Sequence, residues 1–483
     1  MRVLMVAAEC VPLMKTGGLA DAVGGLSRAL GSLGCEVRVL LPCYAAVAQH
    51  MQDPHVIASF DDLFGGPARL VRAQVDDSPT FVLVDAPHLY GRPGNPYLGP
   101  DGKDYADNHF RFAALCRAAA RLVVAEPDGW TVDVVHGHDW QAGLVSAYLR
   151  LGDAGLPPSI FTVHNIAFAG LFPADQLSSL GLPDSFFHPE RLEFYGQISF
   201  LKAGLVFSDR VTTVSPTYAQ EIQSTELGMG FQGVLLARAN DFCGILNGID
   251  ETVWNPETDP LIAQPFHPRS LAGKRVNRVA AQSAMKLDPD AAALLFTVVS
   301  RLTHQKGLDL LAAALPGLVA RGGQLALLGS GSAELEALFE RAAADHPGRV
   351  GVRIGYDEPL SHLLIAGGDA IVLPSRFEPC GLTQLYGLRY GTIPIVARTG
   401  GLSDSVIDAN AAGVAVGAAT GIVFGPDSRE ELERALARAF DLFADRAEWQ
   451  RLIRAAMKQP VGWRRSAESY NAIYDQAREG RRP

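Results

Sequence analysis

The chain has 483 residues, which is too long for one ordinary hydrophobic core and predicts two to four domains. Hydrophobic residues make up 48% and charged residues 19%, as in a globular protein, and 42 basic against 52 acidic residues give a net charge of −10. This excess of acidic residues argues against nucleic acid or an anionic membrane as a partner, although it is compatible with a local basic cleft. The sequence also has no run of about 18 apolar residues that would predict a transmembrane helix.

The cysteines indicate a reducing compartment. Six of them stand at positions 10, 35, 43, 116, 243 and 380, without a CxxC pair or a metal-ligand spacing. They are typical of reduced thiols, and the short apolar run at the N-terminus does not have the layout of a signal peptide. We therefore expect a cytoplasmic protein.

The first thirty residues predict a strand, a loop and a helix. Residues 3–7 are a short apolar run, and residues 20–30 have apolar side chains at helical spacing. The loop between them carries Lys15, Gly17 and Gly18, and glycines let backbone amides approach a ligand while the lysine supplies a full charge. The loop suits a phosphate or diphosphate. Its spacing is neither G-x-G-x-x-G nor a Walker loop, so a plain β-α connection remains the alternative.

Short apolar strands and helices then alternate as far as about residue 250. We expect strands at 36–41, 132–136, 159–164 and 210–214, a small antiparallel excursion within 56–84, an irregular Gly/Pro-rich loop at 88–104, and helices at 107–125 and near 198–208. This alternation predicts parallel β-α-β units in a sheet covered on both faces.

A second series of the same kind follows a polar, proline-rich stretch at 255–281, which we interpret as the approach to a second domain. Its expected strands are 294–299, 324–328, 350–354, 370–373 and 393–397. The pattern breaks near Pro460, and residues 463–477 predict a last amphipathic helix. We therefore expect two α/β domains of comparable size, 1–250 and 251–460, with residues 461–483 turning back onto the first.

Polar side chains that follow the predicted strands are candidate site residues, because ligands of parallel α/β sheets bind beyond the carboxyl ends of the strands. The first half offers Lys15, Gly17, Gly18, His138, Asp139, His164 and Asn165. The second half offers Ser300, Arg301, Lys306 and residues 329–331, 378–383 and 399–401. Groups of this kind in both halves predict one ligand held between two domains.

Two segments of the second half suit an anion. Arg301 and Lys306, where a strand yields to a helix, would clamp a diphosphate, unless they are merely solvated surface cations. Glu378 precedes Pro379, which suits the first turn of a helix, so the amides of residues 380–383 would meet an anion or a sugar hydroxyl. The alternative role of Glu378 is to face the positive end of the helix dipole.

The remaining sequence features concern binding of a sugar and binding of a metal. His164 would contact a sugar, act as a general base, or be a structural histidine. No metal-ligand constellation follows the strands, so we expect no metal and no cofactor, and phosphate charge would be met by Lys15, Arg301 and Lys306. Sugar hydroxyls need short polar partners, and the loops supply Asp21, Asp139, His164, Asn165, Asn247 and Glu378.

Seven motifs occur in order along the whole chain. They are KTGGLADAVGGL (15–26), HGHDWQAGL (136–144), TVHNIAFAGLFP (162–173), TTVSPTYAQEI (212–222), LNGID (246–250), SRLTHQKGLDLL (300–311) and PSRFEPCGLTQLYGLRYGTIPIVARTGGLSDSV (374–406). Through them the chain closely resembles the bacterial glycogen synthases, which are related to plant starch synthases. The resemblance implies two Rossmann-like domains facing across a cleft, the GT-B architecture. It also implies transfer of glucose from ADP-glucose to the non-reducing 4-hydroxyl of an α-1,4-glucan such as glycogen, with retention of configuration and release of ADP.

The resemblance further implies roles for single residues. Lys15, Gly17 and Gly18 would meet the donor's phosphate and glucose, and Arg301 and Lys306 would neutralise the diphosphate. His164 would bond the glucose and stabilise oxocarbenium character through its carbonyl. Glu378 would hold the glucose hydroxyls, beside the amides of Cys380, Gly381 and Leu382 and with Thr383 near the phosphates. Tyr97, Asp139 and Asn247 are similar to family positions around the sugar.

The sequence departs from related transferases at one position, and two other functions are compatible with it. Many related retaining transferases carry a second glutamate eight positions after the first, where this chain has Tyr386, so ribose contacts are not carried over there. The first alternative is a retaining transferase of the same architecture that uses a UDP-sugar, against which Tyr386 and its QLYG context argue. The second is a non-catalytic glucan-binding or nucleotide-sugar-sensing protein, which predicts a missing cation or glutamate.

Overall fold

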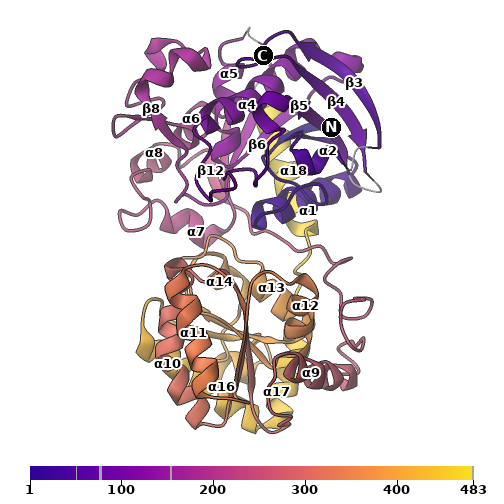
Figure 1. The fold of residues 1–483 in the computed structure, drawn as a ribbon, viewed down its shortest axis with the longest axis vertical. Helices are drawn as coiled ribbons and strands as arrows, with labels where there is room; N and C mark the ends of the chain where they lie inside the picture. The colour runs from indigo at the N-terminus through magenta and orange to yellow at the C-terminus, as the bar shows by residue number, and fades with distance from the viewer. Residues whose placement is uncertain (50–51, 76–78, 153–154, 481–483) are drawn as a thin grey trace. The chain divides into compact units, whose positions relative to one another are not determined.

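The computed structural model describes residues 1–49, 52–75, 79–152 and 155–480. They form two compact units, Met1–Gly248 with Trp463–Pro483, and Ile249–Gly462. Each unit is an α/β fold with a sheet between helices (Figure 1). In the described part of the chain, every helix is too short or too polar to cross a membrane.

The first unit is built on a nine-stranded sheet in the order β12-β11-β7-β6-β1-β2-β5-β4-β3. The strands are β1 (Arg2–Val6), β2 (Glu36–Pro42), β3 (Gln52–Phe60), β4 (Ala68–Gln74), β5 (Thr80–Asp85), β6 (Val134–His138), β7 (Ser159–Val163), β11 (Arg210–Thr213) and β12 (Phe242–Gly244). The antiparallel excursion expected within 56–84 is the edge of this sheet. Strand β5 pairs in parallel with β2, and β4 runs antiparallel to both of its neighbours, β5 and β3.

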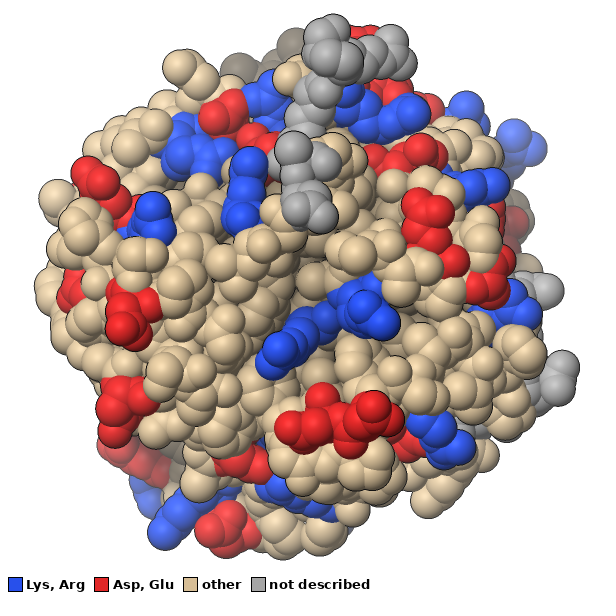
Figure 2. Space-filling model, turned by 90° about the horizontal axis from the view of Figure 1, so that it is seen from above, with Lys and Arg blue, Asp and Glu red and all other residues tan. Residues whose placement is uncertain are grey.

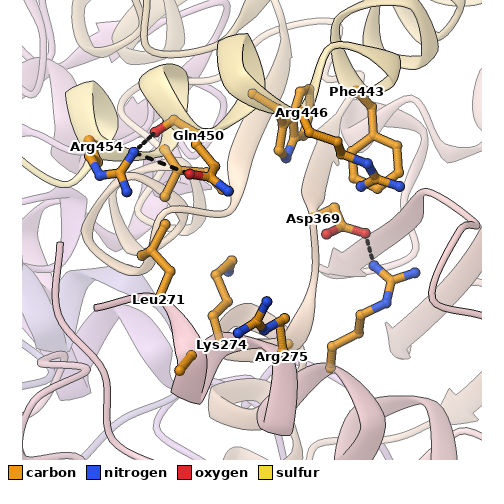
Figure 3. A pocket seen from close by; sticks show the side chains of 13 residues that line it. Leu271, Lys274, Arg275, Asp369, Phe443, Arg446, Gln450 and Arg454 are labelled. Carbon is orange, nitrogen blue, oxygen red and sulfur yellow. Dashed lines mark hydrogen bonds and ion pairs between the residues drawn. The ribbon is translucent and has the colours of Figure 1, made fainter. Parts of the chain in front are cut away.

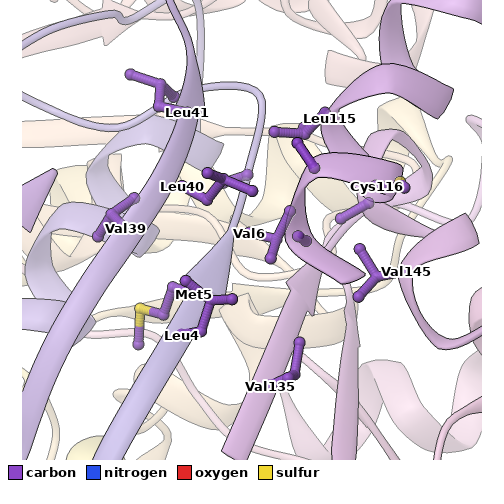
Figure 4. Packing of buried hydrophobic residues seen from close by; sticks show 14 of the residues in the cluster. Leu4, Met5, Val6, Val39, Leu40, Leu41, Leu115, Cys116, Val135 and Val145 are labelled. Atoms are coloured by element: carbon purple, nitrogen blue, oxygen red, sulfur yellow. The ribbon is translucent and has the colours of Figure 1, made fainter. Parts of the chain in front are cut away.

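The central strands of this sheet are continuous apolar runs, as expected of parallel strands buried on both faces. Leu4 and Val6 of β1 and Leu40 of β2 are fully buried. They belong to one hydrophobic cluster with Leu115 and Val145 of the covering helices (Figure 4). This packing fixes where the strands end, and therefore where the loops that follow them begin.

The helices of the first unit are α1 (Gly18–Ser32), α2 (Ala45–Ala48), α3 (Pro87–Tyr90), α4 (Asn108–Ala125), α5 (Leu144–Leu149), α6 (Phe200–Phe207), α7 (Pro216–Glu221), α8 (Gln232–Ala237) and α18 (Arg464–Glu479). Helix α3 lies at the start of the 88–104 segment, which we expected to be an irregular loop. That expectation was wrong at Tyr90, which belongs to α3 and is a fully buried side chain whose hydroxyl donates to the Arg111 carbonyl. A second, three-stranded sheet, β8 (Leu171–Pro173), β10 (Gln197–Ser199) and β9 (Glu193–Phe194), follows β7.

Helix α18 packs against α1 although more than 400 residues separate them in sequence (Figure 1). A Cβ atom built on Gly25 would lie 2.0 Å from the Trp463 indole nitrogen, so the close approach of the two segments requires glycine. Tyr470 and Tyr474 of α18 are buried in the core of the first unit. The glycine pair of the AVGGL segment therefore serves packing.

The second unit has a six-stranded, fully parallel sheet in the order β15-β14-β13-β16-β17-β18. Its strands are β13 (Leu295–Val299), β14 (Gln324–Gly329), β15 (Val350–Ile354), β16 (Ala370–Leu373), β17 (Ile393–Ala397) and β18 (Ile422–Phe424). Its helices are α9 (Ala272–Ala284), α10 (Leu308–Ala320), α11 (Ala333–Asp345), α12 (Glu358–Gly367), α13 (Thr383–Tyr390), α14 (Gly400–Ser405), α15 (Ala411–Ala415), α16 (Arg429–Ala444) and α17 (Arg446–Ala456).

Helix α9 lies within the stretch that we interpreted as an approach to the second domain. Its buried side chains include Lys274, Asn277, Arg278 and Gln282, so its inward face is largely polar and lacks the apolar periodicity of an ordinary covering helix.

Charged side chains of both signs are interspersed on the surface of the molecule that Figure 2 shows, where Lys and Arg side chains alternate with Asp and Glu side chains.

Candidate active site

The candidate residues of the first unit follow neighbouring strands. Lys15 lies in the loop after β1, Asp139 directly after β6, His164 directly after β7, and Asn247 in the segment after β12. These strands are successive or nearly successive in the sheet order β12-β11-β7-β6-β1, and they run parallel. Their carboxyl ends meet at one edge, so the fold gathers this set at the place where α/β proteins bind ligands.

Glu9 organises the loop after β1. Its carboxylate is 2% exposed and accepts hydrogen bonds from the Thr16 amide and from the Thr16 hydroxyl, the latter at 2.7 Å. It also accepts from the hydroxyl of Tyr97, which lies 88 residues further along the chain. Burial and the neighbouring Glu9 raise the pKa of the Tyr97 phenol well above its usual value, so this hydroxyl stays protonated and donates. Sequence reasoning missed Glu9.

The cation of this loop has a carboxylate partner. Lys15 Nζ lies 3.0 Å from Asp21 Oδ1 in the first turn of α1, and both side chains are partly exposed. A Cβ atom built on Gly17, the residue before α1, would meet open space. No described protein group therefore requires glycine at position 17, and the backbone there is open to approach.

Three histidines form a row behind this edge, of which His136 and His138 are buried and His164 is half-buried. His138 Nδ1 and His164 Nε2 are 3.1 Å apart, and His136 bonds through Nε2 to the Thr162 hydroxyl at 2.6 Å and through Nδ1 to the Tyr474 hydroxyl at 2.7 Å. Burial lowers the pKa of His136 and of His164 to about 3, and that of His138 well below its usual value. All three imidazoles are neutral at pH 7 and both accept and donate hydrogen bonds.

Strand β6 runs two residues beyond the predicted 132–136, because His138 still pairs with Thr162 of β7. The next residue, Asp139, has a φ of +60°, a backbone conformation that costs free energy for any residue other than glycine. Its side chain is 6% exposed, and Oδ1 has no hydrogen-bond partner among the described residues. Burial raises the pKa of Asp139 to about 7, although the amides of His164 and Trp140 oppose the shift. This carboxyl group therefore changes protonation near neutral pH.

In the second unit, a lysine and a glutamate from adjacent strand ends form the centre of the candidate site. Lys306, after β13, places Nζ 2.5 Å from Oε2 of Glu378, which follows β16. The Ser375 hydroxyl donates to the same oxygen at 3.1 Å, and Glu378 is 5% exposed. Arg301, in the same loop as Lys306, is exposed. The carboxylate is thus fixed by two donors, and a second cation stands nearby in sequence.

The helix expected to begin at Pro379 begins at Thr383 instead. Gly381 has a φ of +72°, and the Gln384 side chain donates to the carbonyls of Cys380 and Gly381 at 3.0 Å each, which closes a turn before the helix. Cys380, Gly381 and Leu382 lie in this turn and Thr383 opens α13. The prediction of a helical first turn at residues 379–382 was wrong, because the left-handed Gly381 interrupts the helical path, whereas Thr383 is a helix residue.

The TGG segment supports Glu378 from behind. Gly400 has a φ of +41°, and a Cβ atom built on it would lie 1.9 Å from the Glu378 carbonyl oxygen. The Gly401 amide donates to the same carbonyl at 3.2 Å. Glycine at position 400 is therefore required by the close approach of these two strand-end loops.

Tyr386 is used in packing. Its ring stacks on Trp254 with centroids 3.7 Å apart and an angle of 14°, and Trp254 stacks on His362 with the same separation and angle. The His362 ring bonds to the Asp259 carboxylate at 2.7 Å, and the Tyr390 hydroxyl donates to the same oxygen at 2.6 Å. At this position the chain has an aromatic stack in place of a carboxylate.

The candidate residues therefore form two sets. Lys15, Gly17, Gly18, Tyr97, Asp139, His164 and Asn247 belong to the first unit, and Arg301, Lys306, Glu378, Cys380, Gly381, Leu382 and Thr383 belong to the second. Within the described residues, no three His, Cys, Asp or Glu side chains gather as a group that could hold a metal ion.

Two family models and several relatives match this chain. Residues 2–237 match the starch synthase catalytic domain, and residues 284–458 match glycosyl transferases group 1. The chain is 54% identical to the glycogen synthase of Roseobacter denitrificans over 98% of this chain and 99% of that one. It is 53% identical to the glycogen synthase of Paracoccus denitrificans with the same coverage.

Two solved structures are also similar to this chain. The catalytic domain of Starch Synthase IV from Arabidopsis thaliana bound to ADP and acarbose superposes with a TM-score of 0.88 at 33% identity over 99% of both chains. A sucrose-phosphate synthase from Thermosynechococcus elongatus, with a TM-score of 0.61 at 18% identity over 99% of both chains, shares the fold. The two-domain α/β architecture is the GT-B architecture expected from the seven motifs. The resemblance is thus confirmed, and the chain belongs to the glycogen synthase and starch synthase family, glycosyltransferases that synthesise glucan from ADP-glucose.

Proposed function

We propose that this enzyme transfers glucose from ADP-glucose to the non-reducing 4-hydroxyl of an α-1,4-glucan, releases ADP and retains the anomeric configuration. The glycogen synthase relatives and the ADP-bound starch synthase structure support this donor and this acceptor. The observation that carries the proposal is the Lys306–Glu378 pair, a cation and a carboxylate held 2.5 Å apart at the carboxyl ends of β13 and β16.

The second unit holds the donor in this proposal. Arg301 and Lys306 neutralise the diphosphate, since guanidinium and ammonium groups stabilise charge that develops on a leaving phosphate oxygen. Glu378 accepts from glucose hydroxyls through the lone pairs that Lys306 and Ser375 leave open. The amides of Cys380, Gly381 and Leu382 lie beside the glucose and Thr383 beside the phosphates.

The first unit handles the sugar and the reacting bond. The neutral His164 and the titrating Asp139 exchange hydrogen bonds with glucose hydroxyls. Tyr97 and the backbone at Gly17 and Gly18 are oriented through Glu9, and Asn247 supplies an amide at the same strand edge. A donor phosphate competes with Asp21 for the Lys15 ammonium.

We propose a front-face displacement for the chemical step. The C1–O bond to the diphosphate breaks as the acceptor's O4 forms its bond to C1 on the same face, and the O4 proton passes to the departing phosphate oxygen. In this proposal Glu378 holds the glucose and does not attack C1, and its Oε2 accepts from Lys306 and Ser375. Isolation of a covalent glucosyl ester on Glu378 during turnover would refute this step.

The experiment is an assay of nucleoside diphosphate release with glycogen as acceptor, run with ADP-glucose and with UDP-glucose at equal concentrations. We expect ADP release that depends on glycogen and a much smaller rate with UDP-glucose. Preference for UDP-glucose would indicate the alternative transferase, and binding of both ligands without release would indicate a non-catalytic protein. Proton NMR of the new linkage tests retention, since inversion would give a β-anomer.

We also propose that the reaction takes place in the cytoplasm. All six cysteines are thiols rather than disulfides, and five are buried. Burial raises the pKa of Cys10 to about 12 and that of Cys43 to about 11, which keeps both thiols protonated and unreactive. Such thiols fit a reducing compartment.

A further inference from the structure

The second unit has a cavity of about 290 Å³ far from Glu378. It is lined by α9, by the turn before β16, and by residues of α16 and α17, including Lys274, Arg275, Asp369, Arg446 and Arg454. Asp369 directly precedes β16, whereas Glu378 follows it, so the cavity lies at the amino ends of the strands and the candidate active site at their carboxyl ends. We call this cavity the basic pocket.

Two of the charged side chains in the basic pocket are fully engaged by the protein. The Asp369 carboxylate accepts from the Arg278 guanidinium and from the Leu295 amide. The Lys274 ammonium is buried and donates to the carbonyls of Ala366 and Tyr390 and to the Thr392 hydroxyl, at 3.0, 3.1 and 2.7 Å. Among the described residues that line the pocket, Asp369 is the only carboxylate, and its pairing with Arg278 leaves the other cations without a carboxylate partner there.

Three more guanidinium groups surround the cavity, from α9 on one side and α17 on the other (Figure 3). Arg446 lies 3.8 Å from the centre of the Phe443 ring, and Arg454 donates to Gln450 and to a carbonyl oxygen. Among the described residues, no carboxylate forms an ion pair with Arg275, Arg446 or Arg454. In a chain with a net charge of −10, this is a local excess of positive charge.

The walls also hold two buried N–H groups without an acceptor. The indole Nε1 of Trp449, a side chain 3% exposed, and the guanidinium Nε of Arg278, 8% exposed, have no hydrogen-bond partner among the described residues. Leaving a buried donor unsatisfied costs stability, so native proteins rarely do so without a reason. An anion in the cavity would supply the missing acceptor oxygens.

We propose that the basic pocket binds a small phosphate-bearing metabolite, separately from the sugar nucleotide. Guanidinium groups match phosphate oxygens in paired, coplanar hydrogen bonds, and three of them here face one cavity. The volume is close to the lower end of the range for ligand pockets, roughly 300–1,000 Å³, which fits inorganic phosphate or a phosphate monoester of a sugar. The phosphate group is the element that the pocket recognises.

Isothermal titration of the full-length enzyme with inorganic phosphate and with glucose 1-phosphate, at constant ionic strength, tests the proposal. We expect saturable binding that Arg275→Gln and Arg446→Gln each weaken by about tenfold or more. Trp449→Phe, which removes only the indole N–H, should weaken it less. Tighter binding of glucose 1-phosphate would show that a phosphate ester is the ligand, and equal binding would show that phosphate alone suffices.

Two controls separate the basic pocket from other anion sites. Arg451→Gln changes another arginine of α17, one that pairs with Glu448 and does not line the pocket, and should leave the affinity unchanged. Lys306→Ala changes the candidate active site and should also leave it unchanged. The proposal is overturned if neither probe binds, if binding survives both pocket substitutions in folded protein, or if Lys306→Ala abolishes it.

Discussion

The two sets of strand-end residues differ in charge although they occupy equivalent places in two similar sheets. In the first unit, burial makes His138 and His164 neutral and brings the pKa of Asp139 to about 7. In the second unit, Lys306 and Glu378 stand as an ion pair, and the exposed Arg301 lies in the same loop as Lys306. The comparison teaches that the neutral side chains of the first set suit hydroxyl groups, whereas the cations of the second set suit phosphate, and a sugar nucleotide presents both kinds of group.

Removal of either partner of the ion pair should have the largest effect. We expect Lys306→Ala and Glu378→Ala each to lower kcat/KM for ADP-glucose on the order of a thousandfold, about 4 kcal/mol, because each removes a preorganised charge and leaves its partner unpaired. The measurement is ADP release with glycogen. Lys458→Ala, at an exposed lysine of the same unit, is the matched control and should have no effect. Activity of both pair variants within tenfold of wild type would remove the basis for the comparison.

The second largest loss of activity is expected when Gly400, which packs against the Glu378 backbone, is replaced. Gly400→Ala should lower kcat/KM on the order of a hundredfold, because the new methyl group would meet the Glu378 carbonyl oxygen at 1.9 Å and displace the carboxylate. Gly417→Ala is its control, since that glycine also has a positive φ, +66°, but a Cβ atom there would meet nothing within 4 Å. It should cost only about 1 kcal/mol of stability. Equal kinetic effects of the two substitutions would mean that backbone strain alone is responsible.

A smaller effect should identify the positioning role of Glu9 in the first unit. Tyr97→Phe removes the hydroxyl that donates to the buried Glu9 carboxylate, and we expect kcat/KM to fall by about tenfold, in line with about 1.5 kcal/mol for a hydrogen bond to a charged group. Tyr105→Phe is the matched control, because that hydroxyl of the same segment donates to the Pro93 carbonyl and not to Glu9. A loss that is equal in both variants would point to the loop in general.

Much of the fold could be predicted from the sequence because parallel strands are buried on both faces. The expected strands at 350–354, 370–373 and 393–397 have the same bounds as β15, β16 and β17. The small sheet after β7 could not be found in this way, since its strands are two or three residues long and have no periodicity. Helix α9 lacked a signal because its buried side chains are largely polar.

Prediction of the site from local sequence pattern has the same limit as prediction of the fold. The strand-end rule selected Lys15, Asp139 and His164 from local pattern, and the structure gathers them at one sheet edge. Glu9 has partners 7 and 88 residues away, so nothing near it in the sequence marks it as different from a core position of the AAEC segment. Long-range hydrogen bonds of this kind become visible only when the chain is folded.

The smallest expected effect concerns stability and tests whether the histidine row of the first unit is neutral because it is buried. The folded pKa of His136 is about 3 against 6.5 in the unfolded chain, so below pH 6.5 the unfolded state binds more protons and acidification destabilises the fold. His138 and His164 act in the same direction. Asp139 opposes them, since its raised pKa makes the folded state bind more protons between about pH 4 and 7.

Three histidines outweigh one aspartate, so the free energy of unfolding of the first unit should fall as the pH falls from 6.5 to 5. His136→Gln should reduce the slope of this fall by roughly 1 kcal/mol per pH unit, whatever it does to the stability at pH 7. Urea unfolding at half-unit pH steps measures the slope. His55→Gln, at an exposed histidine, should keep the wild-type slope. An unchanged slope in His136→Gln would mean that this imidazole is already protonated in the folded protein and that burial does not keep the histidine row neutral.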